Sequence, residues 1–318
     1  MSVRRGAVLL GSALVLTSCL WGTRAAKFSG PRPSARDVAS PEGLDLGLAH
    51  TRIAWGREVY LDGSEVALPT SFPEGASQAD LSPSGRYLVY VTGFVVDDKI
   101  EWLDLDTGER RVLAGESDFT PRALALGNPS FTADEQTVVF EVGWSNAIKV
   151  AAVDLASGHI DVVDTPGAAN TYPRVSPDGR WIVVSCEDGD PGGNWALCLI
   201  DREARTRTTL TDDEGYDPLL GGLFTPDGQF VVYFTGDTSL GGDGRVYRIG
   251  IDGQDKLLLV SGIYQGDALL ATTERETVFS CGYPETPACS WVCVVNLDGT
   301  DVRRLTYLGD QCVDVNVP

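Results

Sequence analysis

The chain has 318 residues, of which 43% are hydrophobic and 22% are charged, and its formal net charge is −20 at pH 7. These proportions are those of a folded globular protein with enough apolar residues for a large core. The acidic excess repels phosphate groups, so it excludes nucleic acid as a partner and favours basic proteins or cations.

The N-terminus has the pattern of an export signal. Arg4 and Arg5 precede an apolar run, residues 6–16, and the quartet Leu16-Thr-Ser-Cys19 follows. The run is too short to span a bilayer, which needs about 20 apolar residues, so residues 1–18 are predicted to be a cleaved signal peptide. The quartet resembles the lipobox of bacterial lipoproteins, which implies that Cys19 is lipidated. An ordinary signal peptide with a Cys near its end is the alternative.

The expected location is the bacterial cell envelope, where the lipid holds the protein on a membrane. Leu20 follows the Cys at the position where Asp would favour inner-membrane retention, so the outer membrane is predicted, facing the periplasm or the cell surface. The next segment, residues 19–43, contains Pro31, Pro33 and Pro41 and no apolar period, which predicts a flexible tether.

One short phrase then returns five times along the chain. Its copies are Leu81-Ser-Pro-Ser-Gly-Arg86, Phe131-Thr-Ala-Asp-Glu-Gln136, Val175-Ser-Pro-Asp-Gly-Arg180, Phe224-Thr-Pro-Asp-Gly-Gln229 and Leu270-Ala-Thr-Thr-Glu-Arg275. Their last residues are 50, 44, 49 and 46 positions apart, and each copy precedes a short apolar run rich in β-branched and aromatic residues. This period is typical of the four-stranded blade of a β-propeller.

Within each repeat, the phrase is predicted to be a tight turn between the first and second strands, because Pro presets φ and Gly supplies a positive φ. A second turn after the third strand carries an aspartate, as in Asp104, Asp154 and Asp298. These aspartates are expected to accept hydrogen bonds from nearby backbone amides rather than to bind a ligand.

The blade count follows from the lengths. Five repeats cover about residues 77–306, and residues 52–55, 58–61 and 65–68 read as three further strands. The C-terminal residues 312–317 would supply the missing strand of that sheet and close the ring, which removes exposed sheet edges. The prediction is therefore an all-β fold, with residues 44–318 forming a six-bladed β-propeller whose first and last segments share one blade.

The stretch Tyr172-Pro-Arg-Val-Ser-Pro-Asp-Gly-Arg180 and the ending Leu210-Thr211 resemble the TolB-type propeller repeat, over nearly all of the mature chain. The resemblance implies a propeller without the N-terminal α/β domain of TolB. It indicates function weakly, because this repeat serves envelope scaffolds, sugar lyases and peptidase side domains alike.

Seven cysteines fit an oxidising compartment, since Cys19 leaves an even number for disulfides. Cys186 and Cys198 are 12 residues apart, as are Cys281 and Cys293, and the two pairs align in the repeat. Each pair would join the second strand of a blade to the third. Cys289 and Cys312 remain, and they would tie a loop to the last strand.

The acidic loops suggest a candidate binding face. Loops between second and third strands emerge on the same face of a propeller as the blade-to-blade connections, and binding residues concentrate on such loops. The candidate residues are Asp97, Asp98, Glu187, Asp188, Asp190, Asp237, Asp243 and Asp267. The alternative is that these carboxylates only keep the surface soluble. No cofactor is expected except calcium, for which Glu187, Asp188, Asp190 and Asn194 offer oxygen ligands.

The central channel is the second candidate site. Asp80, Arg174 and Asp314 are predicted at equivalent positions of the channel-lining strands. Arg174 would face carboxylates across the axis or bind the carboxylate of a ligand.

Catalytic motifs are missing: the chain has two His and no nucleophile elbow, zinc-protease helix or phosphate loop. The prediction is a non-enzymatic, monomeric scaffold that binds an envelope protein of basic character. The alternatives are a propeller that binds calcium or carbohydrate and an enzyme that acts on polysaccharide.

Overall fold

The computed structural model describes residues 52–55, 58–61, 64–65, 76–93, 97–163, 169–187, 195–211, 218–236, 244–263, 269–282 and 290–308. The predicted signal peptide, the lipidated Cys19 and the tether lie outside these residues. Within the described part of the chain, no helix has the length and apolar character needed to cross a membrane.

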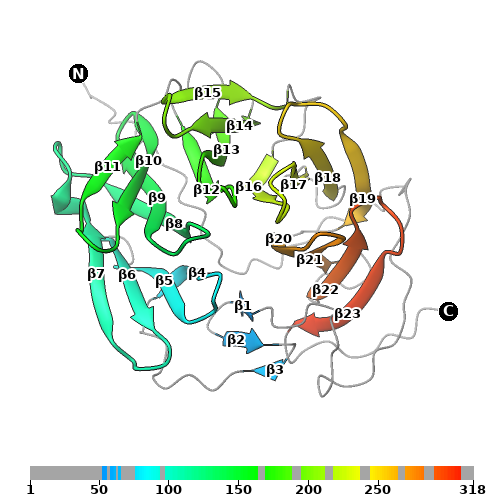
Figure 1. The fold of residues 1–318 in the computed structure, drawn as a ribbon, viewed down its shortest axis with the longest axis horizontal. Helices are drawn as coiled ribbons and strands as arrows, with labels where there is room; N and C mark the ends of the chain where they lie inside the picture. The colour runs from blue at the N-terminus through cyan, green and yellow to red at the C-terminus, as the bar shows by residue number, and fades with distance from the viewer. Residues whose placement is uncertain are drawn as a thin grey trace, which may run out of the picture.

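Five four-stranded antiparallel sheets are arranged around a common centre, as the sequence period predicts (Figure 1). Blade 1 consists of β4 (Ser77–Leu81), β5 (Tyr87–Thr92), β6 (Lys99–Asp104) and β7 (Arg110–Gly115). Blade 2 consists of β8 (Ala125–Phe131), β9 (Thr137–Trp144), β10 (Ala147–Asp154) and β11 (Ile160–Val163), and a short 3₁₀ helix, η1 (Glu116–Asp118), precedes it. Blade 3 consists of β12 (Asn170–Val175), β13 (Trp181–Glu187), β14 (Trp195–Asp201) and β15 (Thr206–Thr209).

Blade 4 consists of β16 (Pro218–Phe224), β17 (Phe230–Thr235), β18 (Gly244–Gly250) and β19 (Leu257–Ile263). Blade 5 consists of β20 (Leu269–Thr272), β21 (Glu276–Gly282), β22 (Ser290–Asn296) and β23 (Arg303–Leu308). The first strand of each blade is the innermost one in Figure 1.

A three-stranded sheet lies in the ring between blade 5 and blade 1 (Figure 1). Its strands are β1 (Arg52–Trp55), β2 (Glu58–Leu61) and β3 (Ser64–Glu65). The first two match the predicted strands, whereas the third is described over two residues only. The C-terminal residues 312–317 lie outside the described part of the chain, so the sixth blade and its closure by that strand stay predictions.

The hydrophobic core is distributed over the boundaries between blades. Along β9, Val138 and Phe140 pack toward blade 1, while Val139 between them packs toward blade 3. The sheet of blade 2 is therefore covered on both faces, which explains why its strands read as continuous apolar runs rather than as alternating patterns.

The repeated phrase forms the predicted turn and owes its composition to one hydrogen-bond pattern. In blade 3, Ser176 Oγ accepts the Trp181 amide at 2.9 Å and donates to Asp178, which in turn accepts the Arg180 amide at 3.0 Å. Thr132 with Asp134 and Thr225 with Asp227 repeat the pattern.

These hydroxyl groups hold the pKa of Asp134, Asp178 and Asp227 below the usual range. Carboxylates of this kind stabilise the fold above their unfolded-state pKa, and the contribution is lost as the pH falls through the folded-state value.

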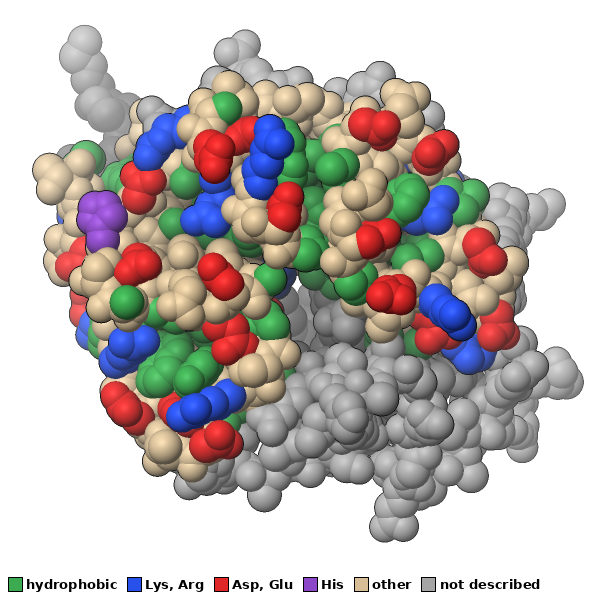
Figure 2. Space-filling model, viewed as in Figure 1, with side chains coloured by type: hydrophobic (Ala, Val, Ile, Leu, Met, Phe, Trp, Pro, Cys, Tyr) green, Lys and Arg blue, Asp and Glu red, His purple; other side chains and the backbone are tan. Residues whose placement is uncertain are grey.

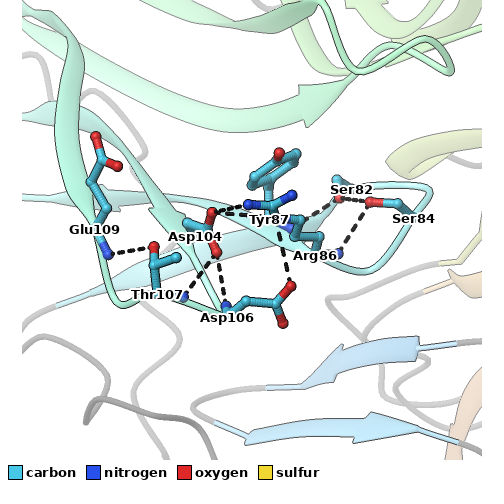
Figure 3. A network of polar contacts seen from close by, with 8 residues as sticks. All are labelled: Ser82, Ser84, Arg86, Tyr87, Asp104, Asp106, Thr107 and Glu109. Atoms are coloured by element: carbon cyan, nitrogen blue, oxygen red, sulfur yellow. Dashed lines mark hydrogen bonds and ion pairs between the residues drawn. The ribbon is translucent and has the colours of Figure 1, made fainter.

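The aspartates of the second turn also bind backbone, as predicted. Asp104 Oδ1 accepts the amides of Asp106 and Thr107 at 2.8 and 3.1 Å, and its other oxygen accepts Arg86 from the first turn (Figure 3). Asp154, Asp201, Asp252 and Asp298 bind amides in the corresponding turns. We call the face of the ring that carries these short turns the turn face. Its aspartates therefore bind backbone amides of the protein itself.

A second repeated feature is a β-bulge in the innermost strand of the blade. Gln78, Asn128, Tyr172 and Gly221 occupy equivalent positions in four consecutive blades, and all have positive φ between 45° and 72°. We call these four residues the inner collar. A bulky residue such as Tyr172 adopts this backbone region only under strain, so the surrounding structure must hold it in place.

The predicted Cys186–Cys198 disulfide is present and joins β13 to β14, with the two Cα atoms 5.9 Å apart. Cys281 and Cys293 have the same offset in the pairing of β21 with β22, and Cys293 is disulfide-bonded. The pairing of Cys281 with Cys293 stays a prediction, and Cys289 and Cys312 lie outside the described residues.

The inner collar is tight enough to require glycine in blade 4. Replacing Gly221 by Ala would place a Cβ 2.6 Å from the Tyr172 carbonyl oxygen, whereas a Cβ at Gly158, with a similar φ, would meet nothing within 4 Å. We expect Gly158→Ala to cost about 1 kcal/mol for the left-handed backbone alone, and Gly221→Ala to cost about 1–3 kcal/mol more because of the overlap. Urea unfolding measures both, and equal losses would show that the collar relaxes freely.

Candidate functional site

We call the face of the ring that carries the loops between second and third strands the loop face. On it, the structure describes the loop of blade 1, where the predicted residues Asp97 and Asp98 differ in their surroundings. Asp98 is half-buried, and its Oδ2 accepts the amide of Leu126 at 3.3 Å on the innermost strand of blade 2. Burial is the main reason that its pKa is raised, and the nearby Glu116 and Asp97 raise it further. Asp98 therefore joins two blades rather than facing a partner.

Asp97 is available at the surface. Its carboxylate lies 3.2 Å from Lys99 and 3.4 Å from Arg122, and all three side chains are exposed, at 53%, 41% and 57% respectively. Arg122 is anchored separately, 2.8 Å from the buried carboxylate of Glu116. Exposed ion pairs contribute about 0–1 kcal/mol each, so a basic partner can displace them from Asp97 at little cost.

Glu187 was predicted to lie in an exposed loop, but it lies in a strand. It is the last residue of β13, is paired there with Trp195, and is only 8% exposed. The strand extends one residue further than expected, which turns a loop position into a buried one. Asp188, Asp190, Asn194, Asp237, Asp243 and Asp267 lie outside the described residues. Among the described residues, no group of three His, Cys, Asp or Glu side chains could hold a metal ion.

The innermost strands place Asp80 and Arg174 at equivalent positions, as predicted, opposite Val89 and Val183 of the neighbouring second strands. Asp80 has a structural partner, because its Oδ2 accepts the amide of Phe131 in blade 2 at 3.1 Å. The third predicted channel residue, Asp314, lies outside the described residues.

Side chains of blade 1 thus satisfy three backbone amides along β8. Asp98 binds the Leu126 amide, Asp80 binds the Phe131 amide, and between them Gln78 Oε1 accepts the Asn128 amide at 2.8 Å. An innermost strand has no further strand beyond it, so its free amides need such acceptors. We refer to these contacts between blades as amide clasps.

Glu141 forms the clasp between blades 2 and 3, and it is the most unusual residue of the channel region. Its Oε1 accepts both the backbone amide of Tyr172 at 2.5 Å and the Nδ2 of Asn128 at 2.6 Å. Ser185, at the equivalent position of the next blade, binds the Gly221 amide at 2.9 Å. The inner collar is thereby connected through four blades.

Burial raises the pKa of the Glu141 carboxyl, although the amide of Tyr172, the side chain of Asn128 and the charge of Arg174 partly oppose the shift. The same burial, together with Glu141, raises the pKa of the Tyr172 hydroxyl. A partly buried acidic group with a shifted pKa is a frequent mark of a functional site.

The sequence analysis missed Glu141, Asn128, Tyr172 and Gln78. A signal was present for one of them, because Glu141 interrupts the apolar strand Thr137-Val-Val-Phe-Glu-Val142, and a charged residue inside such a strand needs a specific partner. The collar itself gave no signal, since its positive φ values follow from the bulge and not from the residue types.

The aromatic residues near the described loops serve packing. Trp102 is 7% exposed and lies between the ring of Tyr87, 4.9 Å away, and the guanidinium of Arg111, 4.5 Å away. Trp144 packs against Phe119 and donates its Nε1 hydrogen to the carbonyl of Pro121 at 2.8 Å. Both indole rings are therefore engaged within the protein.

Comparison with known proteins rests on structure, because no protein-family model matches the chain. TolB from Acinetobacter baumannii is similar with a TM-score of 0.60 and 18% identity, over 78% of this chain and 59% of TolB. The chain thus spans less than two thirds of that protein's length. The fold is a TolB-like β-propeller.

Enzymes share this fold. A puromycin-hydrolyzing peptidase of Mycobacterium tuberculosis matches with a TM-score of 0.56 and 17% identity, over 81% of this chain and 43% of the peptidase. An oligogalacturonate lyase from Vibrio parahaemolyticus matches with a TM-score of 0.54 and 16% identity, over 73% of this chain and 66% of the lyase. These matches correct the prediction that the protein is not an enzyme, because the same scaffold occurs in enzymes and a missing motif does not exclude catalysis.

Glu141 makes a specific prediction for the pH dependence of stability. Its pKa is higher in the folded protein than the ordinary 4.5, so ionisation is less favourable in the folded state, and wild-type stability falls as the pH rises from 4.5 toward the folded-state value. Glu141→Gln keeps the Oε1 acceptor and removes the charge. We expect the stability of this variant, relative to wild type, to increase with pH over that interval.

Urea unfolding at several pH values measures this difference, and Glu109→Gln, at an exposed turn position, serves as the control for loss of one carboxylate. Parallel pH profiles for wild type and Glu141→Gln would contradict the placement of a buried, ionisable carboxyl at this clasp.

Proposed function

We propose that the protein is a lipid-anchored scaffold of the bacterial envelope that binds a basic protein partner through its loop face. The observation that carries the proposal is the different use of carboxylates on the two faces of the ring. Turn-face aspartates of the repeats bind backbone amides, whereas Asp97 on the loop face makes only exposed ion pairs.

The scaffold supports this role mechanically. Amide clasps and shared cores join neighbouring blades, so loops that leave the ring start from fixed positions. Loops on a rigid framework lose little conformational entropy on binding, which favours recognition. Residues 44–318 hold 19 basic and 43 acidic side chains, so their field attracts a basic partner.

The TolB-like fold is compatible with envelope proteins, and the lipobox-like quartet ending at Cys19 would hold the propeller at a membrane. Residues 19–43 would then act as a tether that keeps the loop face away from the lipid surface.

The loop face is tested by capture of partners from envelopes of the native cells. The fourfold variant Asp188→Asn, Asp190→Asn, Asp237→Asn and Asp243→Asn should retain at least about tenfold less of a partner held by wild type, because each lost charge removes a fraction of the attraction. Its thermal stability should not change. Capture with calcium and with a chelator shows whether the loops also need a cation.

A matched variant loses four carboxylates from exposed turn positions instead: Asp106→Asn, Glu109→Gln, Glu203→Gln and Glu274→Gln. Its capture should equal that of wild type. Equal losses in both variants would show that net charge alone governs binding, and full capture by the loop-face variant would refute the proposed site.

The lipid anchor is tested separately by substitution of Cys19. In cells supplied with labelled palmitate, Cys19→Ser should incorporate no label and should leave the membrane fraction, whereas Leu20→Ala should remain labelled and membrane-bound. Labelling of Cys19→Ser would place the acyl group elsewhere and would reject the lipobox interpretation.

A further inference from the structure

One position of the innermost strands shows how the blades differ around the channel. The residues that pair with the third residue of the second strand are Asp80, Ser130, Arg174, Leu223 and Ala271. The fifth member is Ala271, because the first turn of blade 5 is two residues shorter than in the other blades. Arg174 is the one cation among these five described residues.

Arg174 lacks the role that its counterpart has in blade 1. Asp80 accepts a hydrogen bond from an amide of the next blade. A guanidinium contains only donors and no acceptor atom, so it cannot form such a clasp. Within the described residues, its hydrogen bond is to the carbonyl of Pro173, at 3.0 Å from Nη1, and no carboxylate lies within 4.0 Å. The other half of the guanidinium fork therefore has no protein partner among the described residues.

Some described arginines have a carboxylate partner: Arg86, Arg122 and Arg180 each bind one at 2.8–3.0 Å. Others bind a backbone carbonyl instead, as Arg202 binds that of Gly179 at 2.8 Å. Arg174 belongs to this second group; it is half-buried and lies on the innermost strand of blade 3.

Glu141 presents a complementary group next to Arg174. Both of its protein hydrogen bonds use Oε1, and within the described residues Oε2 accepts none. Oε2 lies beside Gly127, where an added Cβ would come within 3.3 Å of it and within 3.1 Å of Gln78 Oε1. The positive charge of Arg174 acts on Glu141, yet the two groups do not form an ion pair.

We propose that the central channel binds a small hydroxylated carboxylate, whose carboxylate pairs with the guanidinium of Arg174 and whose neighbouring hydroxyl donates to Oε2 of Glu141. The planar guanidinium matches a carboxylate with two parallel hydrogen bonds. The strained collar residue Tyr172 and the clasp to Glu141 fix both groups before the ligand arrives, which lowers the entropic cost of binding.

The electrostatics select this class of ligand. Within the described residues Oε2 of Glu141 accepts no hydrogen bond, so it can accept one from a ligand hydroxyl. One cation compensates one negative charge, and the surrounding acidic field disfavours polyanions. Figure 2 shows a hollow near the centre of the described residues.

The probe is D-glucuronate, with D-glucose as its uncharged counterpart and propionate as a carboxylate without hydroxyl groups. Isothermal titration of the full-length lipidated protein in detergent should show binding of D-glucuronate, weaker binding of propionate, and none of D-glucose. Arg174→Ala should weaken D-glucuronate binding at least about tenfold, and Arg174→Lys should not restore it fully, because an ammonium group lacks the planar fork.

Glu141→Gln should weaken D-glucuronate more than propionate, since only the former uses Oε2. Arg122→Ala, which removes an exposed loop-face arginine, should bind as wild type does. The proposal is overturned if D-glucuronate shows no binding up to about 10 mM, if D-glucose binds equally well, or if Arg174→Ala binds normally. Circular dichroism confirms that each variant is folded, and loss of loop-face capture leaves this result unaffected.

Discussion

The structure depends on satisfying the free amides of the innermost strands. An antiparallel blade pairs each strand except on its two edges, so the amides of the inner edge need acceptors from elsewhere. The chain meets this requirement with the amide clasps, in which Asp80, Gln78, Glu141 and Ser185 reach from one blade to the next. The bulge at the inner collar places the amides of Asn128, Tyr172 and Gly221 toward their acceptors, so the collar strain and these three clasps belong together.

The same requirement explains why a very acidic chain shows few unengaged carboxylates among its described residues. Described carboxylates accept hydrogen bonds from turn amides, as in Figure 3, from amides of the next blade, and from arginine side chains. Few of them are therefore left to bind a partner. Acidic and basic side chains are interspersed over the face seen in Figure 2, in agreement with this internal use. Function is therefore sought where the pattern is broken: at Asp97, whose ion pairs are exposed, and at Arg174, which takes the place of an acceptor.

The sequence predicted those parts of the fold that depend on residues close together in the chain. The turn phrase, the turn aspartates and the Cys186–Cys198 disulfide involve residues 2–12 positions apart, so their spacing could be read directly. The clasps join residues of different blades, and one sequence gives no register between blades. For this reason Asp80 was predicted in the channel without its partner Phe131, and Glu141 was missed. Glu187 was placed in a loop because the sequence did not show that β13 extends one residue further.

These two kinds of contact also imply an order of assembly. The turn hydroxyl of each blade reaches an amide five residues away, whereas the clasps bridge 28–51 residues. Contacts over short separations form at small loop-closure cost, so the first hairpin of a blade can appear early and independently. Blades become mutually dependent only through the clasps to the next blade, and we expect docking of blades onto one another to be slower than formation of their first hairpins.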